Sequence, residues 1–189
     1  MNRRYLQKLQ IKDVVFLAIM SAVALATCAV MPLVISLQPL IFGISQLVTA
    51  LQIGVFFAIG LYKVRKPGSL LIMALMMGLI QLMMSPPMFL SSVLNGVLIE
   101  LIVLLLFRGY EKDSAVFCAA MLHTPLSLPF NYLYNRLVKG TDSPLAAVAD
   151  RAPLAAVGMT LAVVAVSALG ALIGIKIARE LKKSGVLKK

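Results

Sequence analysis

The sequence predicts an all-α membrane protein: a bundle of six transmembrane helices in one domain, residues 1–189, with both termini in the cytoplasm. Of the 189 residues, 61% are hydrophobic and 13% are charged, which is too little polar surface for a soluble domain. The apolar runs reach the roughly 20 residues that cross a bilayer. Short segments with Pro, Gly or charge separate them, as helix ends require. The spans are expected at 13–31, 39–62, 69–84, 88–107, 114–137 and 153–177.

The first four spans end at clear stop signals. The first stops at Pro32, and the second ends at the basic turn Arg65-Lys66-Pro67-Gly68. The third ends at Ser85-Pro86-Pro87 and the fourth at Arg108-Gly109-Tyr110. Proline breaks the helical hydrogen-bond ladder, and charged side chains are costly in hydrocarbon. Each of these segments therefore marks a boundary between two spans.

The fifth and sixth spans differ from the others. Pro125 and Pro129 predict that the fifth helix is broken between His123 and Asn131, which would free backbone carbonyls at membrane depth. Such backbone is tolerated only where protein or a cavity satisfies it, so this segment is a candidate pocket wall. Residues 135–152 form a polar outer loop, either a cover over a pocket or a solvated connector. The sixth span continues into a basic, helical tail.

The basic residues predict the orientation. Fifteen of the eighteen Lys and Arg fall on one side of the expected topology and three on the other. Because cytoplasmic loops carry the excess of Lys and Arg, both termini of this plasma-membrane protein are expected in the cytoplasm. The net charge of +11 then faces anionic lipid, so the expected partner is membrane lipid and not nucleic acid. The fifteen are Arg3, Arg4, Lys8, Lys12, Lys63, Arg65, Lys66, Arg108, Lys112, Lys176, Arg179, Lys182, Lys183, Lys188 and Lys189; the three are Arg136, Lys139 and Arg151.

Six polar side chains within the spans are candidates for binding a small-molecule substrate. Glu100 is the acidic residue that lies well inside a span, where an ionisable group is costly unless it is paired or faces a polar cavity. Ser92 and Gly96 precede it at spacings of four and give one helix face a small, polar stripe. The six candidates are Gln46, Gln81, Asn95, Glu100, His123 and Asn131, with Tyr132 and Tyr134 as further polar or stacking groups.

Each candidate also has a structural interpretation. Glu100 is either a functional carboxylate or a residue bonded to a neighbouring helix. The amides of Gln46, Gln81 and Asn95 either touch a ligand or join helices inside the membrane. His123, the sole histidine, is either a pocket residue or a packing residue.

Two rows of small residues predict close helix contacts. Ala18, Ala22 and Ala26 recur at four-residue spacing in the first span, and Gly170, Gly174 and Ala178 do so in the sixth. Small residues in such rows let another helix approach closely. Either row is an internal packing face or a surface for a partner helix.

Several functional classes lack the motifs that they need. The sequence contains no phosphate loop of the G-x-x-x-x-G-K-[ST] type, so ATP-driven transport would require separate ATPase chains. It also contains no H-E-x-x-H, no G-x-S-x-G and no paired intramembrane aspartates. The Met-rich third span lacks the Cys or His pattern of a copper site. We therefore expect no catalytic residue, no metal and no cofactor.

In this order the features resemble the substrate-binding S component of an energy-coupling factor (ECF) transporter. The resemblance covers the whole chain and rests on the six spans with both ends inside, on Ala18-x-x-x-Ala22 after a short basic N-terminus, and on two basic segments. These segments are Val64-Arg65-Lys66-Pro67-Gly68, and Gly170–Arg179 followed by Lys182-Lys183-Ser184-Gly185-Val186. The turn, Glu100 and the tail are most similar to the YkoE-type branch, which is associated with thiamine or its hydroxymethylpyrimidine precursor.

The resemblance implies a non-enzymatic subunit that captures a vitamin-like small molecule at the extracellular face. It implies delivery through a transmembrane coupling protein and two ATPase subunits, with Ala18, Ala22 and Ala26 meeting the coupling protein. Because the chain has no Trp and a Met-rich third span, a larger hydrophobic ligand such as a porphyrin is an alternative. A stand-alone secondary transporter with Glu100 as its proton-linked carboxylate is a second alternative. An intramembrane enzyme using His123 and Glu100 is a third.

Overall fold

The computed structural model describes residues 9–28, 33–34, 36–37, 39–83, 85–138, 140 and 143–185. Part of the sequence-based prediction lies outside these residues. This holds for the end of the first span (29–31) and for six of the eighteen basic residues: Arg3, Arg4, Lys8, Lys139, Lys188 and Lys189.

The described residues form helices and no strands, so the predicted all-α class is confirmed for this part of the chain. Six helices lie where the six spans were expected, and a short seventh lies within the segment predicted to be a polar loop. The helices are α1 (Ile11–Thr27), α3 (Ile44–Val64), α4 (Ser69–Leu82), α5 (Pro86–Phe107), α6 (Asp113–Val138), α7 (Pro144–Arg151) and α8 (Pro153–Lys183).

Three of the helices in the described residues, α3, α5 and α8, are long and apolar enough to cross a membrane by length and composition. The helix α4 is apolar but has 14 residues, and α1 has 17. A membrane-spanning core is thus supported, whereas the number of six spans and the cytoplasmic location of both termini stay predictions.

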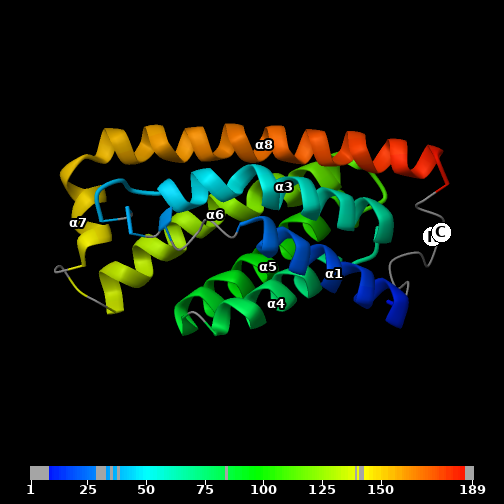
Figure 1. Cartoon of the computed structure of the whole chain (residues 1–189), viewed down its shortest axis with the longest axis horizontal. Helices are drawn as coiled ribbons and strands as arrows, with labels where there is room; N and C mark the ends of the chain where they lie inside the picture. The colour runs from blue at the N-terminus through cyan, green and yellow to red at the C-terminus, as the bar shows by residue number, and fades with distance from the viewer. Residues whose placement is uncertain are drawn as a thin grey trace.

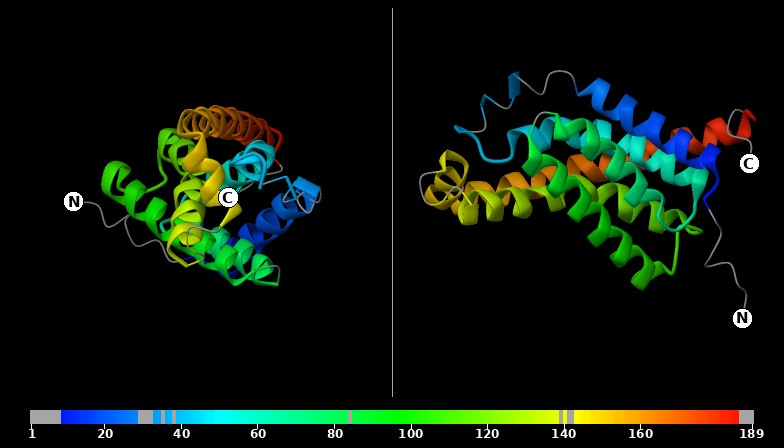
Figure 2. Two further views of the ribbon diagram at one scale, coloured as in Figure 1. Left: turned by 90° about the vertical axis from the view of Figure 1, so that its left-hand side faces the viewer. Right: turned by 90° about the horizontal axis from the view of Figure 1, so that it is seen from below.

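The helices form a closed ring. In the order α1, α4, α5, α6, α8 and α3, each packs against the next, the last packs against α1, and α3 also contacts α6 across the ring (Figures 1 and 2). The start of α1 and the end of α8 lie at one end of the bundle, and α7 lies at the other (Figure 1). The apolar core includes the fully buried side chains of Leu17, Leu70, Val103 and Val116.

The most extensive contact in the ring is that between α3 and α8, and it depends on glycine. A Cβ added at Gly170 would lie 2.5 Å from the Leu51 carbonyl oxygen, and one added at Gly174 would clash with the Val55 carbonyl. Ala178, the next residue in the row, is fully buried. The small-residue row of α8 is therefore an internal packing face, which decides between the two interpretations of that row.

The predicted break in the fifth helix is wrong. The helix α6 is continuous across Pro125 and Pro129. Pro125 lacks the N–H that would bond to the carbonyl oxygen of Met121, and Ser167 of α8 donates its hydroxyl to that oxygen at 2.7 Å. A neighbouring helix thus supplies a donor that the proline removes, a compensation also found in proline-containing transmembrane helices.

Ionic contacts join the helices at the end of the bundle where α1 starts. Asp113, the first residue of α6, pairs with Arg65 after α3 and with Arg179 of α8. Lys66 pairs with Asp13 of α1 at 2.6 Å. The basic turn between α3 and α4 therefore ties three other helices together. We call this end of the molecule the basic end.

Candidate functional site

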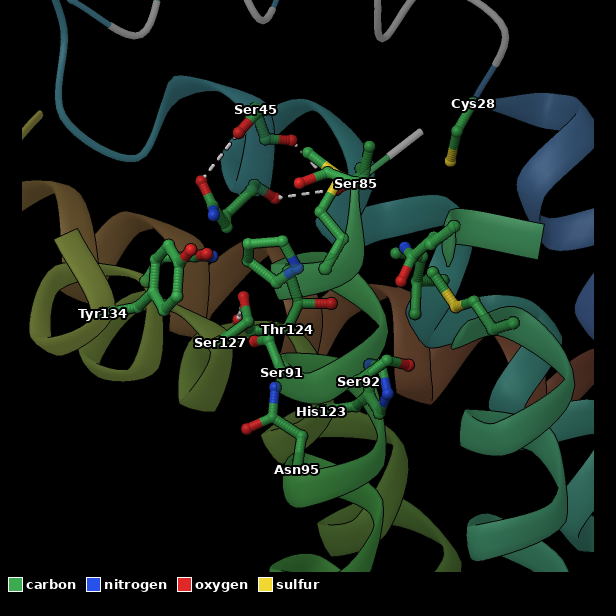
Figure 3. A pocket seen from close by; sticks show the side chains of 18 of the residues that line it. Cys28, Ser45, Ser85, Ser91, Ser92, Asn95, His123, Thr124, Ser127 and Tyr134 are labelled. Carbon is green, nitrogen blue, oxygen red and sulfur yellow. Dashed lines mark hydrogen bonds between the residues drawn. The ribbon is translucent and has the colours of Figure 1, made fainter. Parts of the chain in front are cut away.

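A cavity of about 400 Å³ opens at the end of the bundle opposite the basic end. Its volume is within the range of about 300–1,000 Å³ that small-molecule sites occupy. It is lined by the last residues of α1, the first half of α3, the end of α4, the start of α5, the second half of α6 and Ser143 before α7. Figure 3 shows side chains that line it, with Ser45 at the top of the view and His123 and Asn95 near the bottom.

Five of the six predicted substrate-binding residues line this one cavity. They come from four helices: Gln46 from α3, Gln81 from α4, Asn95 from α5, and His123 and Asn131 from α6. The prediction that polar side chains from separate spans converge at similar depth is consistent with this placement. Whether they bind a substrate stays a prediction.

At the deep end of the cavity, three buried side chains carry polar atoms without a hydrogen-bond partner in the described part of the chain. These atoms are Oδ1 of Asn95, both ring nitrogens of His123 and Oγ1 of Thr124. Each side chain is at least 95% buried, and leaving such a group unpaired costs about 1–3 kcal/mol. Polar groups that are costly to the fold and face a cavity are typical of a binding site.

The His123 ring packs against an aromatic side chain and makes no hydrogen bond within the described part of the chain. Its ring lies 4.4 Å from the ring of Phe57, measured between centroids, with a tilt of 46°. Phe57 is fully buried in the core, so it fixes one face of the imidazole. Neither ring nitrogen has a hydrogen-bond partner among the described residues.

Glu100 is not among the residues that line the cavity, and its role as a substrate ligand stays a prediction. Its Oε1 accepts the backbone N–H of Gly68 at 2.6 Å, and its Oε2 accepts the hydroxyl of the fully buried Tyr110 at 2.9 Å. Gly68 caps the start of α4, where a helix favours a negative group. Glu100 therefore joins α5, α4 and the turn before α6, which is the structural interpretation raised from the sequence.

The sequence reasoning named His123, Asn131 and Tyr134 on α6 but did not name Thr124 and Ser127, which line the cavity beside them. His123, Thr124, Ser127, Asn131 and Tyr134 line the cavity and recur at the spacing of one helix face. This period was the available signal, and the assumption of a broken helix concealed it. Of the two tyrosines, Tyr134 lines the cavity, whereas the hydroxyl of Tyr132 donates to Asp150 of α7 at 2.7 Å.

Small hydroxyl groups and methionines complete the wall, and these too were not predicted as site residues. The lining hydroxyl groups are those of Ser45, Thr49, Ser85, Ser91, Ser92, Thr124, Ser127 and Ser143. Apolar surface comes from Leu25, Cys28, Pro39, Ile53, Met77, Pro87 and Met88.

The alanine row of α1 lies on the outside of the bundle. Ala22 and Ala26 are exposed and Ala18 is half-buried. Around them, Val15 and Ile19 are each 51% exposed. The row thus lies on an apolar outer face of α1, where it contributes less to the described core than Ala24 does.

Two comparisons with known proteins bear on this architecture. The structure resembles a solved structure described as the crystal structure of an S-component of an ECF transporter, with a TM-score of 0.64 and 22% sequence identity. The match covers 95% of this chain and 89% of the other. At this identity the likeness establishes the fold. No curated protein matches the sequence.

The sequence itself matches a family model over residues 11–183, from the start of α1 to the end of α8. The matched residues include those from the described helices that line the cavity. The chain belongs to the family described as hypothetical bacterial integral membrane protein (Trep_Strep).

Proposed function

We propose that this protein is the substrate-specificity subunit of an ECF-type importer. It captures a vitamin-like small molecule at the extracellular face of the plasma membrane and passes it to a coupling protein and two ATPase subunits. The observation that carries this proposal is the cavity, in which Asn95, His123 and Thr124 hold buried polar atoms without partners in the described part of the chain. The S-component fold supports it.

The charge distribution supports the orientation. The cavity lies at the end of the bundle opposite the ion pairs of Arg65, Lys66 and Arg179. With the basic end in the cytoplasm, the cavity faces outward, as capture from outside requires. The YkoE-type branch and its thiamine-related substrates remain a prediction from the sequence.

The outer face of α1 is the proposed contact with the coupling protein. Ala18, Ala22 and Ala26 would let a partner helix approach closely, and the exposed Val15 and Ile19 add apolar surface. An association of this kind is sensitive to bulk at Ala22, because a larger side chain would separate the two helices.

The test is purification of the tagged full-length protein from its native host in mild detergent, with mass spectrometry of the subunits that accompany it. The wild type should retain a coupling protein and two ATPases, and Ala22→Leu should lose most of them. Ala165→Leu changes an exposed alanine of α8 and should retain them. If the wild type carries no ATPase, or if Ala22→Leu behaves as Ala165→Leu does, the proposed assembly is wrong.

A further inference from the structure

The wall of the cavity contains no charged side chain among its described residues. Its polar atoms belong to amides, hydroxyls and one imidazole. This composition contrasts with the 18 Lys and Arg and 7 Asp and Glu of the whole chain. It bears on the substrate, because a binding site of neutral dipoles recognises a different class of molecule from one with an ammonium or a carboxylate.

In the described part of the chain, the acidic residues that form ion pairs are not among the residues that line the cavity. Asp13 and Asp113 pair at the basic end, Asp150 pairs with Arg136 between α7 and α6, and Glu180 pairs with Lys183. Glu100 accepts hydrogen bonds from the Gly68 turn and Tyr110. An ionised substrate entering the cavity would give up its hydration without meeting an opposite charge from the described wall, which is a large cost.

The polar atoms at the deep end specify what the substrate must present. Oδ1 of Asn95 accepts a hydrogen bond, and the hydroxyl of Thr124 can donate or accept one. A neutral imidazole at His123 offers one donor and one acceptor. A substrate that satisfies these groups has both a donor and an acceptor along one edge. The rest of its surface meets Ile53, Met77 and Met88.

Resting on the proposed capture function, we propose that the substrate is an uncharged molecule with hydrogen-bond donors and acceptors on one edge and an apolar body. A neutral heteroaromatic ring carrying an amide or alcohol group has this chemistry. A thiamine-like cation and a porphyrin with ionised propionates do not, because each would bring charges that the described wall does not pair.

The experiment uses the purified full-length protein and a small-molecule filtrate of yeast extract. Ion exchange at neutral pH separates the filtrate into uncharged, cationic and anionic fractions. Each fraction is added to the protein in detergent, and the thermal unfolding midpoint (Tm) is measured. The uncharged fraction should raise Tm by about 5 °C or more at saturation, and native mass spectrometry then identifies the bound molecule.

The outcomes separate this inference from the function on which it rests. If a charged fraction raises Tm as much as the uncharged one or more, the substrate inference is wrong while capture of a small molecule stands. If no fraction raises Tm, the capture function fails, and the substrate inference fails with it.

Two variants test whether the deep polar groups serve the substrate. Thr124→Val keeps the shape of the side chain and removes a hydroxyl without a partner in the described residues, so Tm without additives should stay level or rise. The Tm shift caused by the uncharged fraction should fall by more than half in Thr124→Val, and also in Asn95→Leu.

Ser21→Ala is the control: Ser21 lies outside the cavity and donates to the Met73 carbonyl at 3.1 Å. It should lower Tm and keep the shift; if Thr124→Val and Asn95→Leu also keep it, the assignment of these groups is wrong.

Discussion

Ser167 of α8 donates a hydrogen bond of 2.7 Å to the carbonyl oxygen of Met121 on α6. In a helix this oxygen would accept the backbone N–H of the residue four positions later. That residue is Pro125, which has no N–H. Ser167 is fully buried, so its hydroxyl compensates for the proline where water does not reach. The contact keeps α6 continuous along the cavity wall and fixes it against α8.

Combining Ser167→Ala with Pro125→Ala tests whether the Ser167 hydroxyl compensates for the proline. Ser167→Ala should lower the free energy of unfolding by about 1–3 kcal/mol, because it leaves the Met121 oxygen unsatisfied. In a Pro125→Ala background, where residue 125 supplies the helical N–H, the same change should cost clearly less. Unfolding of the four proteins in detergent gives the coupling energy.

A change elsewhere on α8 provides the control. Thr160→Val removes a hydroxyl that donates to Ala156 one turn earlier in the same helix, and it should cost little in either background. Equal costs of Ser167→Ala with and without Pro125 would contradict the proposed compensation.

The fifth helix also shows where reasoning from the sequence reached its limit. Pro125 and Pro129 predicted a broken helix, because the local rule counts only the N–H that proline lacks. The compensating donor, Ser167, lies 46 residues from Met121 along the chain, and no local sequence pattern predicts it. Once the helix was assumed to break, the regular spacing of His123, Thr124 and Ser127 could not be recognised as one face.

Substitutions of Glu100 can distinguish a role in stability from a role in transport. Glu100→Leu leaves the part-buried Gly68 N–H and the buried Tyr110 hydroxyl without their acceptor, and the buried hydroxyl alone costs about 1–3 kcal/mol. The variant should therefore unfold at lower temperature. Molecules that remain folded should bind the substrate with unchanged affinity, because Glu100 is not among the residues that line the cavity.

The comparison with Glu100→Gln decides between this role and a proton-linked one. An amide keeps one oxygen acceptor, so Glu100→Gln should be less destabilised than Glu100→Leu. A stand-alone transporter coupled to protons through Glu100 predicts instead that Glu100→Gln is stable and abolishes uptake. Uptake by reconstituted vesicles under a pH gradient, measured beside Tm, distinguishes the two.

Other features were predictable because they depend on local composition. Apolar runs and their Pro, Gly and charged ends located six helices, and α3, α5 and α8 reach spanning length. The partners of an individual polar group were not predictable in this way. Glu100 and Asn95 are both buried polar residues of α5, yet Glu100 bonds to Gly68 and Asn95 faces the cavity. The two residues are separated by little more than one helical turn. Tertiary packing therefore determines which of them lines the cavity.

Two glycines of α8 offer a matched pair. Gly170 packs against the backbone of α3 at Leu51, whereas a Cβ at Gly158 would have nothing within 4 Å among the described residues. Gly170→Ala should force α3 and α8 apart and cost about 1–3 kcal/mol, as overpacking does. Gly158→Ala should be neutral or stabilising by up to about 1 kcal/mol, since alanine favours the helix. If both variants have the same Tm, the contact does not limit stability.

At the basic end, Asp113 is the point where three elements meet. It accepts hydrogen bonds from Arg65 after α3, and from Nη2 and Nε of Arg179 on α8 at 2.6 and 3.2 Å. Burial disfavours the charged carboxylate, but the hydrogen bonds from Arg179 and Arg65 outweigh it, so the pKa of Asp113 lies below its usual value.

This lowered pKa predicts how stability depends on pH. A carboxyl whose pKa is lower in the folded protein stabilises it fully above the pKa of the unfolded chain, about 3.9, and loses that effect as the pH falls through the folded pKa. Asp113→Asn should therefore have a lower Tm than the wild type at neutral pH, and the difference should shrink below about pH 4. Glu111→Gln, a change at an exposed side chain, is the control and should follow the wild-type curve. A Tm difference between Asp113→Asn and the wild type that stays constant from neutral to acidic pH would show that the ion pairs of Asp113 do not join these helices.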